Sequence, residues 1–371
     1  MKSLFVAALA TMALASCNKD EGAKTPVENG KTNFEVTLPG ALATYAVETP
    51  QQAGQITPLY NDVTVYLVDA GDNAKAYIWD DAEIKAKAKR FEQIKVPAKV
   101  IVVVNKGAAT LPESATMTVL QEALNTIAVA DQNKALANVA AEDAKGNAAG
   151  DYISAQQVTL YGEQTNFTDE TIEADHDQTH KLKKAAVELK SLVSRFEVGK
   201  VKPGEGLKSL EVEAVYINYF YNAYGKTEKQ ALTENTWLYD TFTPTWATDE
   251  ASTEVTSEDG TKAYAYQVFA GNLVPHIIYK VKGETEGKYK LFDGTEGPFE
   301  GKYITVKGFY EGTTTPITAI EAHKIYKMGL TDGGIEIKAE EITDKPEKEK
   351  VDLLVAVTVA DWTETTVTPE I

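Results

Sequence analysis

Apolar and polar residues alternate over several short stretches of the chain, which is the pattern of strands that bury one face. The first stretch places Phe34, Val36 and Leu38 on one face, with polar residues between them. Two further stretches, 62–68 and 99–105, are rich in Val, and the second is apolar on both faces. We therefore predict three strands, the last of them in the interior of its sheet.

Helical spacing replaces this alternation from Ser114 to about Ala141. Leu120, Leu124 and Ile127 recur at intervals of three and four, and an alanine-rich stretch follows. One or two helices that pack against the strands are expected here. The charged segment 80–90 is compatible with a short helix or a loop.

The second half of the chain has an almost purely β pattern. Its expected strands are 209–221, 263–270, 274–282, 301–310, 324–328, 334–339 and 351–360. Gly, Pro and Asn separate them, which is typical of an antiparallel sandwich. We predict a mainly β fold of two sandwich domains, 33–184 with a helical insertion and 185–371.

The chain begins with a short apolar run that ends at its only cysteine, Cys17. Lys2 precedes the run, which is too short to cross a bilayer as a helix. The sequence Leu14-Ala15-Ser16-Cys17 is similar to the lipobox of bacterial lipoproteins, which implies cleavage between Ser16 and Cys17 and lipidation of Cys17. An ordinary secretory signal is the alternative. We assign 1–16 to the signal peptide and 17–32 to a polar leader.

Composition fits an exported protein with real cores. The chain has 371 residues, 43% of them hydrophobic, which is enough for two domains. Lys and Arg total 37 against 55 Asp and Glu, a formal net charge of −18. This acidic balance argues against a nucleic-acid partner.

Catalytic and cofactor motifs are weak. His176 and His180 stand at metal-ligand spacing only if their segment is helical, and it has the composition of a loop. The glycine-containing stretch 329–334 suggests a hairpin turn rather than a phosphate loop. We expect no metal, no cofactor and no enzymatic activity.

An aromatic cluster raises a different function. Trp237, Tyr239, Phe242 and Trp246 fall close together near polar Asn235 and Asp240. Such side chains can stack on a sugar, or they can cover a long loop on its own sandwich. A surface glycan-binding lipoprotein is therefore the alternative function.

Taken in order, these features resemble the fimbrillin family of Bacteroidota, the subunits of type V pili. The resemblance runs over essentially the whole chain. It rests on the lipobox followed by Asn18-Lys19-Asp20, the strands ending in Val68 and Asn105, the Ala/Leu-rich helix, the strand of Arg195, the segment 234–237 and the closing stretch 355–362.

The resemblance implies two transthyretin-like sandwich domains and assembly by donor-strand exchange. A precursor anchored in the outer membrane by its lipid loses its leader and first strand to a maturation protease. The groove left by Phe34, Val36 and Leu38 then accepts the C-terminal strand of another subunit, so the partners are further copies plus anchor and tip proteins. The candidate donor residues are Val355, Val357, Val359, Trp362, Val367 and Ile371.

The sequence departs from the family where the leader would be cut. The family's shaft subunits are matured after an arginine soon after the first strand, but the only arginines here are Arg90 and Arg195. Either another protease cuts near Ala43-Thr44-Tyr45-Ala46, or the chain keeps its lipid and first strand. A retained strand would suit the basal anchor of the fimbria.

Overall fold

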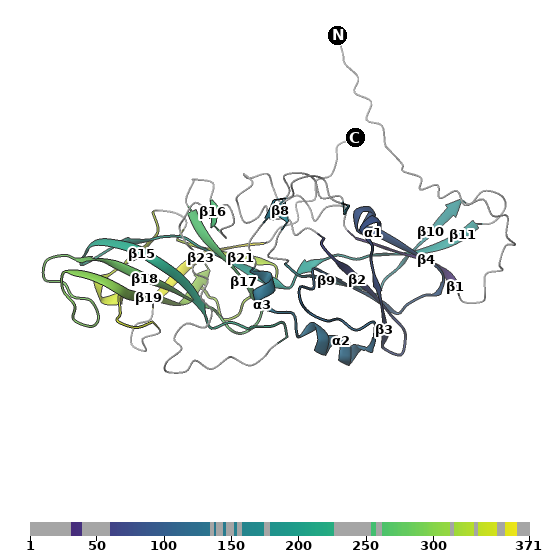
Figure 1. The fold of residues 1–371 in the computed structure, drawn as a ribbon, viewed down its shortest axis with the longest axis horizontal. Coiled ribbons are helices and arrows are strands. Elements are labelled where there is room, and N and C mark those ends of the chain that lie inside the picture. The colour runs from purple at the N-terminus through teal and green to yellow at the C-terminus, as the bar shows by residue number, and fades with distance from the viewer. Residues whose placement is uncertain are drawn as a thin grey trace, which may run out of the picture.

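The computed structural model describes residues 31–38, 60–133, 137–138, 144–145, 152–153, 158–173, 179–225, 254–256, 262–311, 315–329, 333–346 and 353–361. The chain is mainly β, and its strands form two units that lie end to end (Figure 1). We call residues 31–191 the N-terminal unit and residues 193–361 the C-terminal unit. The domain boundary expected at residue 184 falls within a strand of the N-terminal unit.

The N-terminal unit contains two sheets. The four-stranded sheet has the order β10 (Thr168–Glu173), β11 (Thr179–Ala186), β1 (Lys31–Thr37) and β4 (Ala88–Lys95). The six-stranded sheet has the order β12 (Lys190–Ser191), β9 (Leu160–Gln164), β5 (Lys99–Val104), β2 (Val63–Val68), β3 (Asn73–Ile78) and β6 (Ser114–Thr116). The run Val100–Val104 is fully buried, which confirms that β5 is an interior strand.

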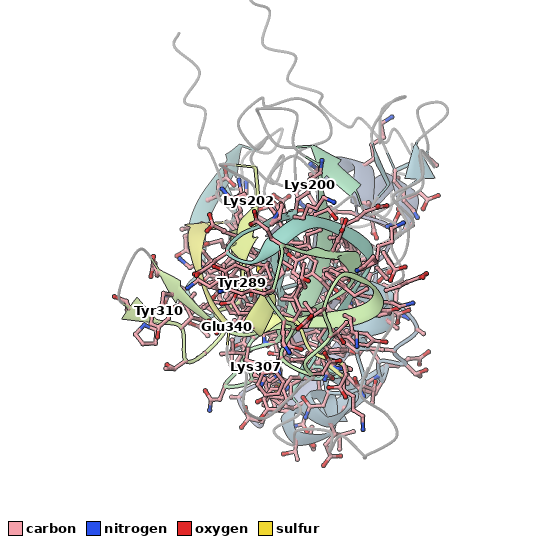
Figure 2. The ribbon with its side chains drawn as sticks, turned by 90° about the vertical axis from the view of Figure 1, so that its left-hand side faces the viewer. Lys200, Lys202, Tyr289, Lys307, Tyr310 and Glu340 are labelled. Carbon is pink, nitrogen blue, oxygen red and sulfur yellow. The ribbon has the colours of Figure 1, made fainter. Side chains whose placement is uncertain are left out.

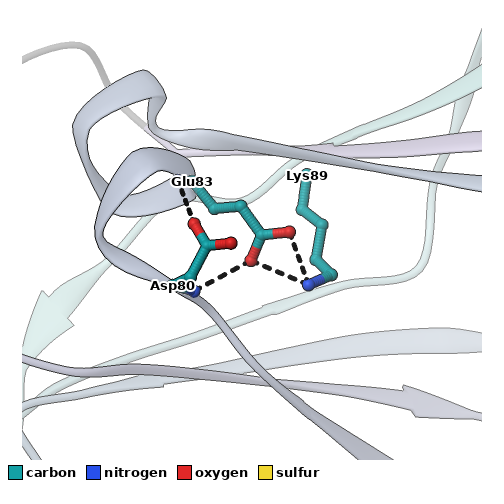
Figure 3. A network of polar contacts seen from close by, with 3 residues as sticks. All are labelled: Asp80, Glu83 and Lys89. Atoms are coloured by element: carbon teal, nitrogen blue, oxygen red, sulfur yellow. Dashed lines mark hydrogen bonds and ion pairs between the residues drawn. The ribbon is translucent and has the colours of Figure 1, made fainter. Parts of the chain in front are cut away.

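A capped helix opens the charged segment 80–90. The Asp80 carboxylate accepts from the Glu83 N–H at 2.9 Å, and Glu83 Oε2 accepts from the Asp80 N–H at 3.0 Å. Lys89 Nζ donates to both Glu83 carboxylate oxygens (Figure 3). This capping box starts α1 (Asp81–Ala86), and the chain then enters β4, a strand that the charged sequence did not predict.

The predicted helical region is shorter than expected. It contains α2 (Met117–Leu124) and α3 (Val129–Gln132). Thr116 caps the start of α2, and the residues after its end include Thr126 and Ile127, whose branched Cβ atoms disfavour continuation of a helix. Beyond α3, the described part of the alanine-rich stretch is a two-residue strand, β7 (Ala137–Asn138), paired with β8 (Tyr152–Ile153).

The C-terminal unit is built on one nine-stranded sheet. Its path is β15 (Leu207–Asn218), β18 (His276–Thr285), β19 (Pro298–Glu311), β23 (Leu353–Asp361), β21 (Lys324–Met328), β13 (Val193–Val198), β17 (Lys262–Phe269) and β16 (Glu254–Thr256), with β20 (Thr315–Pro316) on β19. A separate pair consists of β14 (Val201–Pro203) and β22 (Ile335–Ile337), and η2 (Ala339–Glu341) is a short 3₁₀ helix. In the core, Phe196 packs against Phe309 and Tyr326, with ring centroids 5.4 and 5.0 Å apart.

The sheets are mostly antiparallel, but four described pairs are parallel: β1 with β11, β13 with β21, β14 with β22, and β19 with β23. Parallel partners are remote in sequence, so local alternation could not reveal them. The strands that flank the stretch 329–334 do not pair with each other as a hairpin: β21 runs parallel to β13, and β22 runs parallel to β14. Gly199 N–H donates to Met328 O, and Ile335 N–H donates to Lys200 O, on either side of this stretch.

A buried ion pair lies on β13. Arg195 Nε is 3.3 Å from Glu197 Oε1, and both side chains are almost fully buried. Burial lowers the pKa of the Arg195 guanidinium and raises the pKa of the Glu197 carboxyl, although each partner opposes the shift of the other. Among the described residues, the guanidinium nitrogens have no acceptor at hydrogen-bond geometry. Arg195 is therefore the main compensating charge of Glu197, with a smaller contribution from Lys327.

This pair gives a test of stability. Replacing Arg195 with methionine alone should lower the free energy of unfolding by about 3–5 kcal/mol, because the buried Glu197 carboxylate loses its main compensating charge. Adding Glu197→Leu should recover most of that loss. A double-mutant cycle measured by urea unfolding checks it, and losses that simply add would show that the two side chains do not compensate each other.

Candidate functional site

Strand β1 lies inside its sheet, with a partner on each edge (Figure 1). It runs parallel to β11 and antiparallel to β4. At the level of Phe34, the neighbours are Lys183 on β11 and Phe91 on β4. Both backbone edges of β1 are therefore occupied, although β11 and β4 come from distant parts of the chain.

The inner face of β1 supplies core side chains. Phe34 and Val36 are 0% exposed and Leu38 is 6% exposed. The Phe34 ring meets the Phe167 ring edge-on, with centroids 5.1 Å apart. Full burial of such side chains contributes about 1.5–3 kcal/mol each. The strand predicted from sequence at these three residues thus has its apolar side chains in the core.

The outer face of β1 carries a charge that both neighbours compensate. The Glu35 carboxylate lies 3.5 Å from Arg90 Nη2 on β4 and 3.6 Å from Lys184 Nζ on β11. Lys184 is also 3.9 Å from Glu170 on β10. Half-exposed ion pairs such as these contribute little stability, but they favour one register of the strand.

Removal of β1 would open a groove between β11 and β4. The floor of this β1 groove would expose the Phe167 ring and other core side chains, and both walls would present unpaired backbone groups. An added strand can satisfy the backbone groups and cover the apolar floor at once. The Arg90 and Lys184 side chains would favour an acidic residue on its outer face.

Strand β23 belongs to two parts of the sheet in the C-terminal unit. Residues 353–357 pair in parallel with β19, and residues 358–361 pair antiparallel with β21. Val355 and Val357 are 7% and 4% exposed. Val359 is paired with Tyr326 on β21. Each half of β23 thus has one partner strand among the described residues, and β23 connects β19 with β21.

Several predicted site residues lie outside the described part of the chain. These are Ser16, Cys17, Ala43, Thr44, Tyr45, Ala46, Trp237, Trp246, Trp362, Val367 and Ile371. Their roles in lipidation, maturation, glycan binding and strand donation stay predictions.

The histidines are not gathered into a site. His180 lies in β11 opposite Ile172, and His176 is outside the described residues. His276 stacks on Tyr219, and His323 Nδ1 accepts from the Ser191 N–H at 3.4 Å. In the part of the chain that the structure describes, no three His, Cys, Asp or Glu side chains come together as metal ligands.

A cavity of about 130 Å³ lies in the C-terminal unit, and Figure 2 labels two of its lining residues, Tyr289 and Glu340. Its lining residues are Glu205, Tyr289, Lys290, Lys338, Ala339 and Glu340. The half-exposed Tyr289 ring covers Gly206, where a Cβ would lie 2.7 Å from the ring. Two carboxylates, two ammonium groups and a phenol can bind polar groups, but no nucleophile and base are paired among them.

Within the described ranges, no helix is both long and apolar enough to span a bilayer.

No family model matches the chain, and no curated protein sequence matches it either. Solved structures do resemble it. One is a candidate cell adhesion protein from Bacteroides eggerthii, with 14% identity, coverage of 92% of this chain and 98% of that chain, and a TM-score of 0.47. Another is a fimbrilin from Porphyromonas gingivalis, with 12% identity, 89% and 97% coverage, and a TM-score of 0.45.

A third similar structure is the tip fimbrial protein Mfa3 from Porphyromonas gingivalis, determined with a C-terminal truncation. Its identity is 10%, the coverage is 90% of this chain and 100% of that chain, and the TM-score is 0.39. Such identities and scores are too low to transfer a function. The chain is thus similar, at low identity, to fimbrial and cell adhesion proteins of Bacteroidales.

Proposed function

We propose that the chain is a structural subunit of a cell-surface fimbria that assembles by donor-strand exchange and supports adhesion. The observation that carries the proposal is the interior position of β1, with both edges paired and Phe34 and Val36 fully buried. Loss of an edge strand would only make the next strand the new edge of the sheet. Loss of β1 would leave an apolar groove with two unsatisfied walls, which a strand from a second copy can fill.

The proposed sequence of events begins with export as a lipoprotein. Lipid on Cys17 tethers the precursor to the outer membrane, and β1 fills the groove during folding. A protease that cuts within 43–46 then releases the leader together with β1. The subunit joins the fimbrium on the cell surface when its groove is filled by the C-terminal segment of another subunit.

The pairing of β23 guides our choice of the donor segment. Val355 and Val357 are buried in their own unit, and β23 pairs with both β19 and β21. Donation of β23 itself would require it to leave both partners. We therefore assign strand donation first to 362–371, where Trp362, Val367 and Ile371 supply apolar side chains and Glu370 supplies an acidic one.

The basal anchor of the same fimbria is the second placement. The stretch 39–47 has no basic residue, so a protease specific for arginine or lysine has no site there. A subunit that keeps β1 has an occupied groove and ends the polymer at the membrane.

Polymer analysis tests the proposal against the glycan-binding alternative. Surface protein treated with mild SDS without heating should run as a ladder of multimers, since each buried strand must unfold to be released. A protein that remains monomeric and binds members of a glycan array would instead support the alternative.

A further inference from the structure

The segment from Ile127 to Asn133 connects the two units by backbone hydrogen bonds. Val129 N–H donates to Asn222 O at 2.8 Å, and Tyr224 N–H donates to Ile127 O at 2.9 Å. Asn222 and Tyr224 follow β15 of the C-terminal unit. The two bonds form an antiparallel bridge between Ala128 and Ala223. A short piece of the N-terminal unit thus pairs with the C-terminal unit like a strand.

Asn133 extends this pairing with its side chain. Asn133 Oδ1 accepts from the Gln267 N–H at 2.7 Å, and Asn133 Nδ2 donates to Gln267 O at 2.8 Å. Nδ2 also donates to Val129 O at 3.0 Å, which closes the end of α3. The buried amide therefore makes three hydrogen bonds, two of them to one backbone position of the other unit.

Gln267 lies in the part of β17 that β16 does not cover. On one side, Gln267 is paired with Arg195 of β13. On the other side, β16 pairs only with residues 262–264 of β17. The Asn133 amide presents one donor and one acceptor in the arrangement of a strand partner. It thus takes the place of a strand at the edge of β17 (Figure 1), where α3 lies beside β17.

The other side of α3 is fixed to the N-terminal unit. Gln132 Oε1 accepts from the Thr159 N–H at 2.8 Å, and Gln132 Nε2 donates to Thr159 Oγ1 at 3.0 Å. Thr159 Oγ1 donates to Asn105 O at 2.7 Å. The Asp131 carboxylate accepts from the Ala108 N–H at 2.8 Å. The buried side chains of Asp131 and Gln132 therefore bind the N-terminal unit, and the buried side chain of Asn133, the next residue, binds the C-terminal unit.

We propose that Asn133 is a positioning residue that fixes the orientation of the two units, so that they move together as one rigid body. Because buried polar groups are costly to leave unpaired, the two units are held where all of these bonds can form. On the proposed function, the β1 groove lies in one unit and the donor segment follows the other. A fixed angle between the units then sets the direction in which each subunit adds to the next.

Distances between spin labels in the unassembled chain test this inference. The background is the full chain with Cys17→Ser, labelled at Ile78→Cys in one unit and Lys288→Cys in the other, both exposed positions. We expect one narrow distance peak. Asn133→Ala should replace it with a broad distribution, and calorimetry should then show two unfolding transitions in place of one.

Thr343→Val is the matched control. The buried Thr343 hydroxyl donates to Lys345 O at 2.7 Å, within the C-terminal unit alone, so its loss should leave the peak narrow. Asn133→Asp keeps the acceptor and loses the donor, and it should broaden the peak partly, which provides a second variant if the alanine variant does not fold. A narrow, unshifted peak in a folded Asn133 variant would overturn the inference. The measurement needs no polymer, so it is independent of whether the chain forms fimbriae.

Discussion

Replacing Phe34 with alanine is expected to lower the free energy of unfolding of the unassembled full chain by about 3–5 kcal/mol. The Phe34 ring is fully buried and packs edge-on against Phe167, and its loss leaves a cavity that β11 and β4 cannot close without breaking their pairing with β1. Urea unfolding of the purified precursor measures the change. Ile78→Ala is the control, because Ile78 is 69% exposed and should change stability by no more than about 0.5 kcal/mol.

The same substitution distinguishes the precursor from the assembled form. If β1 leaves during maturation, assembled subunits no longer contain Phe34, and those that form should resist SDS as wild-type subunits do. The yield of polymer should fall, because fewer precursors fold, but the stability of each polymer should not. Polymers that dissociate more easily would show that β1 is still in the groove.

Deletion of 363–371 is expected to give a folded, exported monomer that forms no SDS-resistant ladder. The deletion leaves β23 complete, so β19 and β21 keep the strand that connects them. What it removes is all but Trp362 of the segment 362–371 that we assign to the groove of the next subunit. Circular dichroism and the urea midpoint of the truncated chain check the fold, and unheated SDS gels check assembly.

A longer deletion, of 353–371, provides the comparison. It removes β23 with the buried Val355 and Val357. The C-terminal unit of the unassembled chain should therefore be less stable than that of the wild type. Comparing the stability and the SDS ladders of the two truncations distinguishes a strand that the fold needs, β23, from a segment that only assembly needs, 363–371. Normal ladders from the shorter truncation would contradict the assignment.

The strands with strong local patterns could be predicted from sequence, and those set by distant partners could not. Phe34, Val36 and Leu38 alternate and lie in or next to β1, and the doubly apolar run of β5 is in the sheet interior. By contrast, β4 carries Lys89, Arg90 and Glu92, so its sequence lacks the apolar pattern of a strand. It is a strand because it pairs with β1. Tertiary pairing outweighs local propensity there.

The groove was only partly predictable for the same reason. Sequence indicated the strand that fills it, whereas its walls, β11 and β4, gave no signal that they flank β1. The cations that compensate Glu35 come from those walls. The sequence did not point to Asp131, Gln132 and Asn133, and only the structure shows which of their side chains bind which unit.

N-terminal sequencing of subunits sheared from the cell surface tests the central claim most directly. The account predicts that shaft subunits begin after residue 38, so that Phe34, Val36 and Leu38 are gone and the β1 groove is open to another strand. A start at blocked, lipidated Cys17 in every subunit of the polymer would mean that β1 stays in place, and it would contradict assembly through the β1 groove.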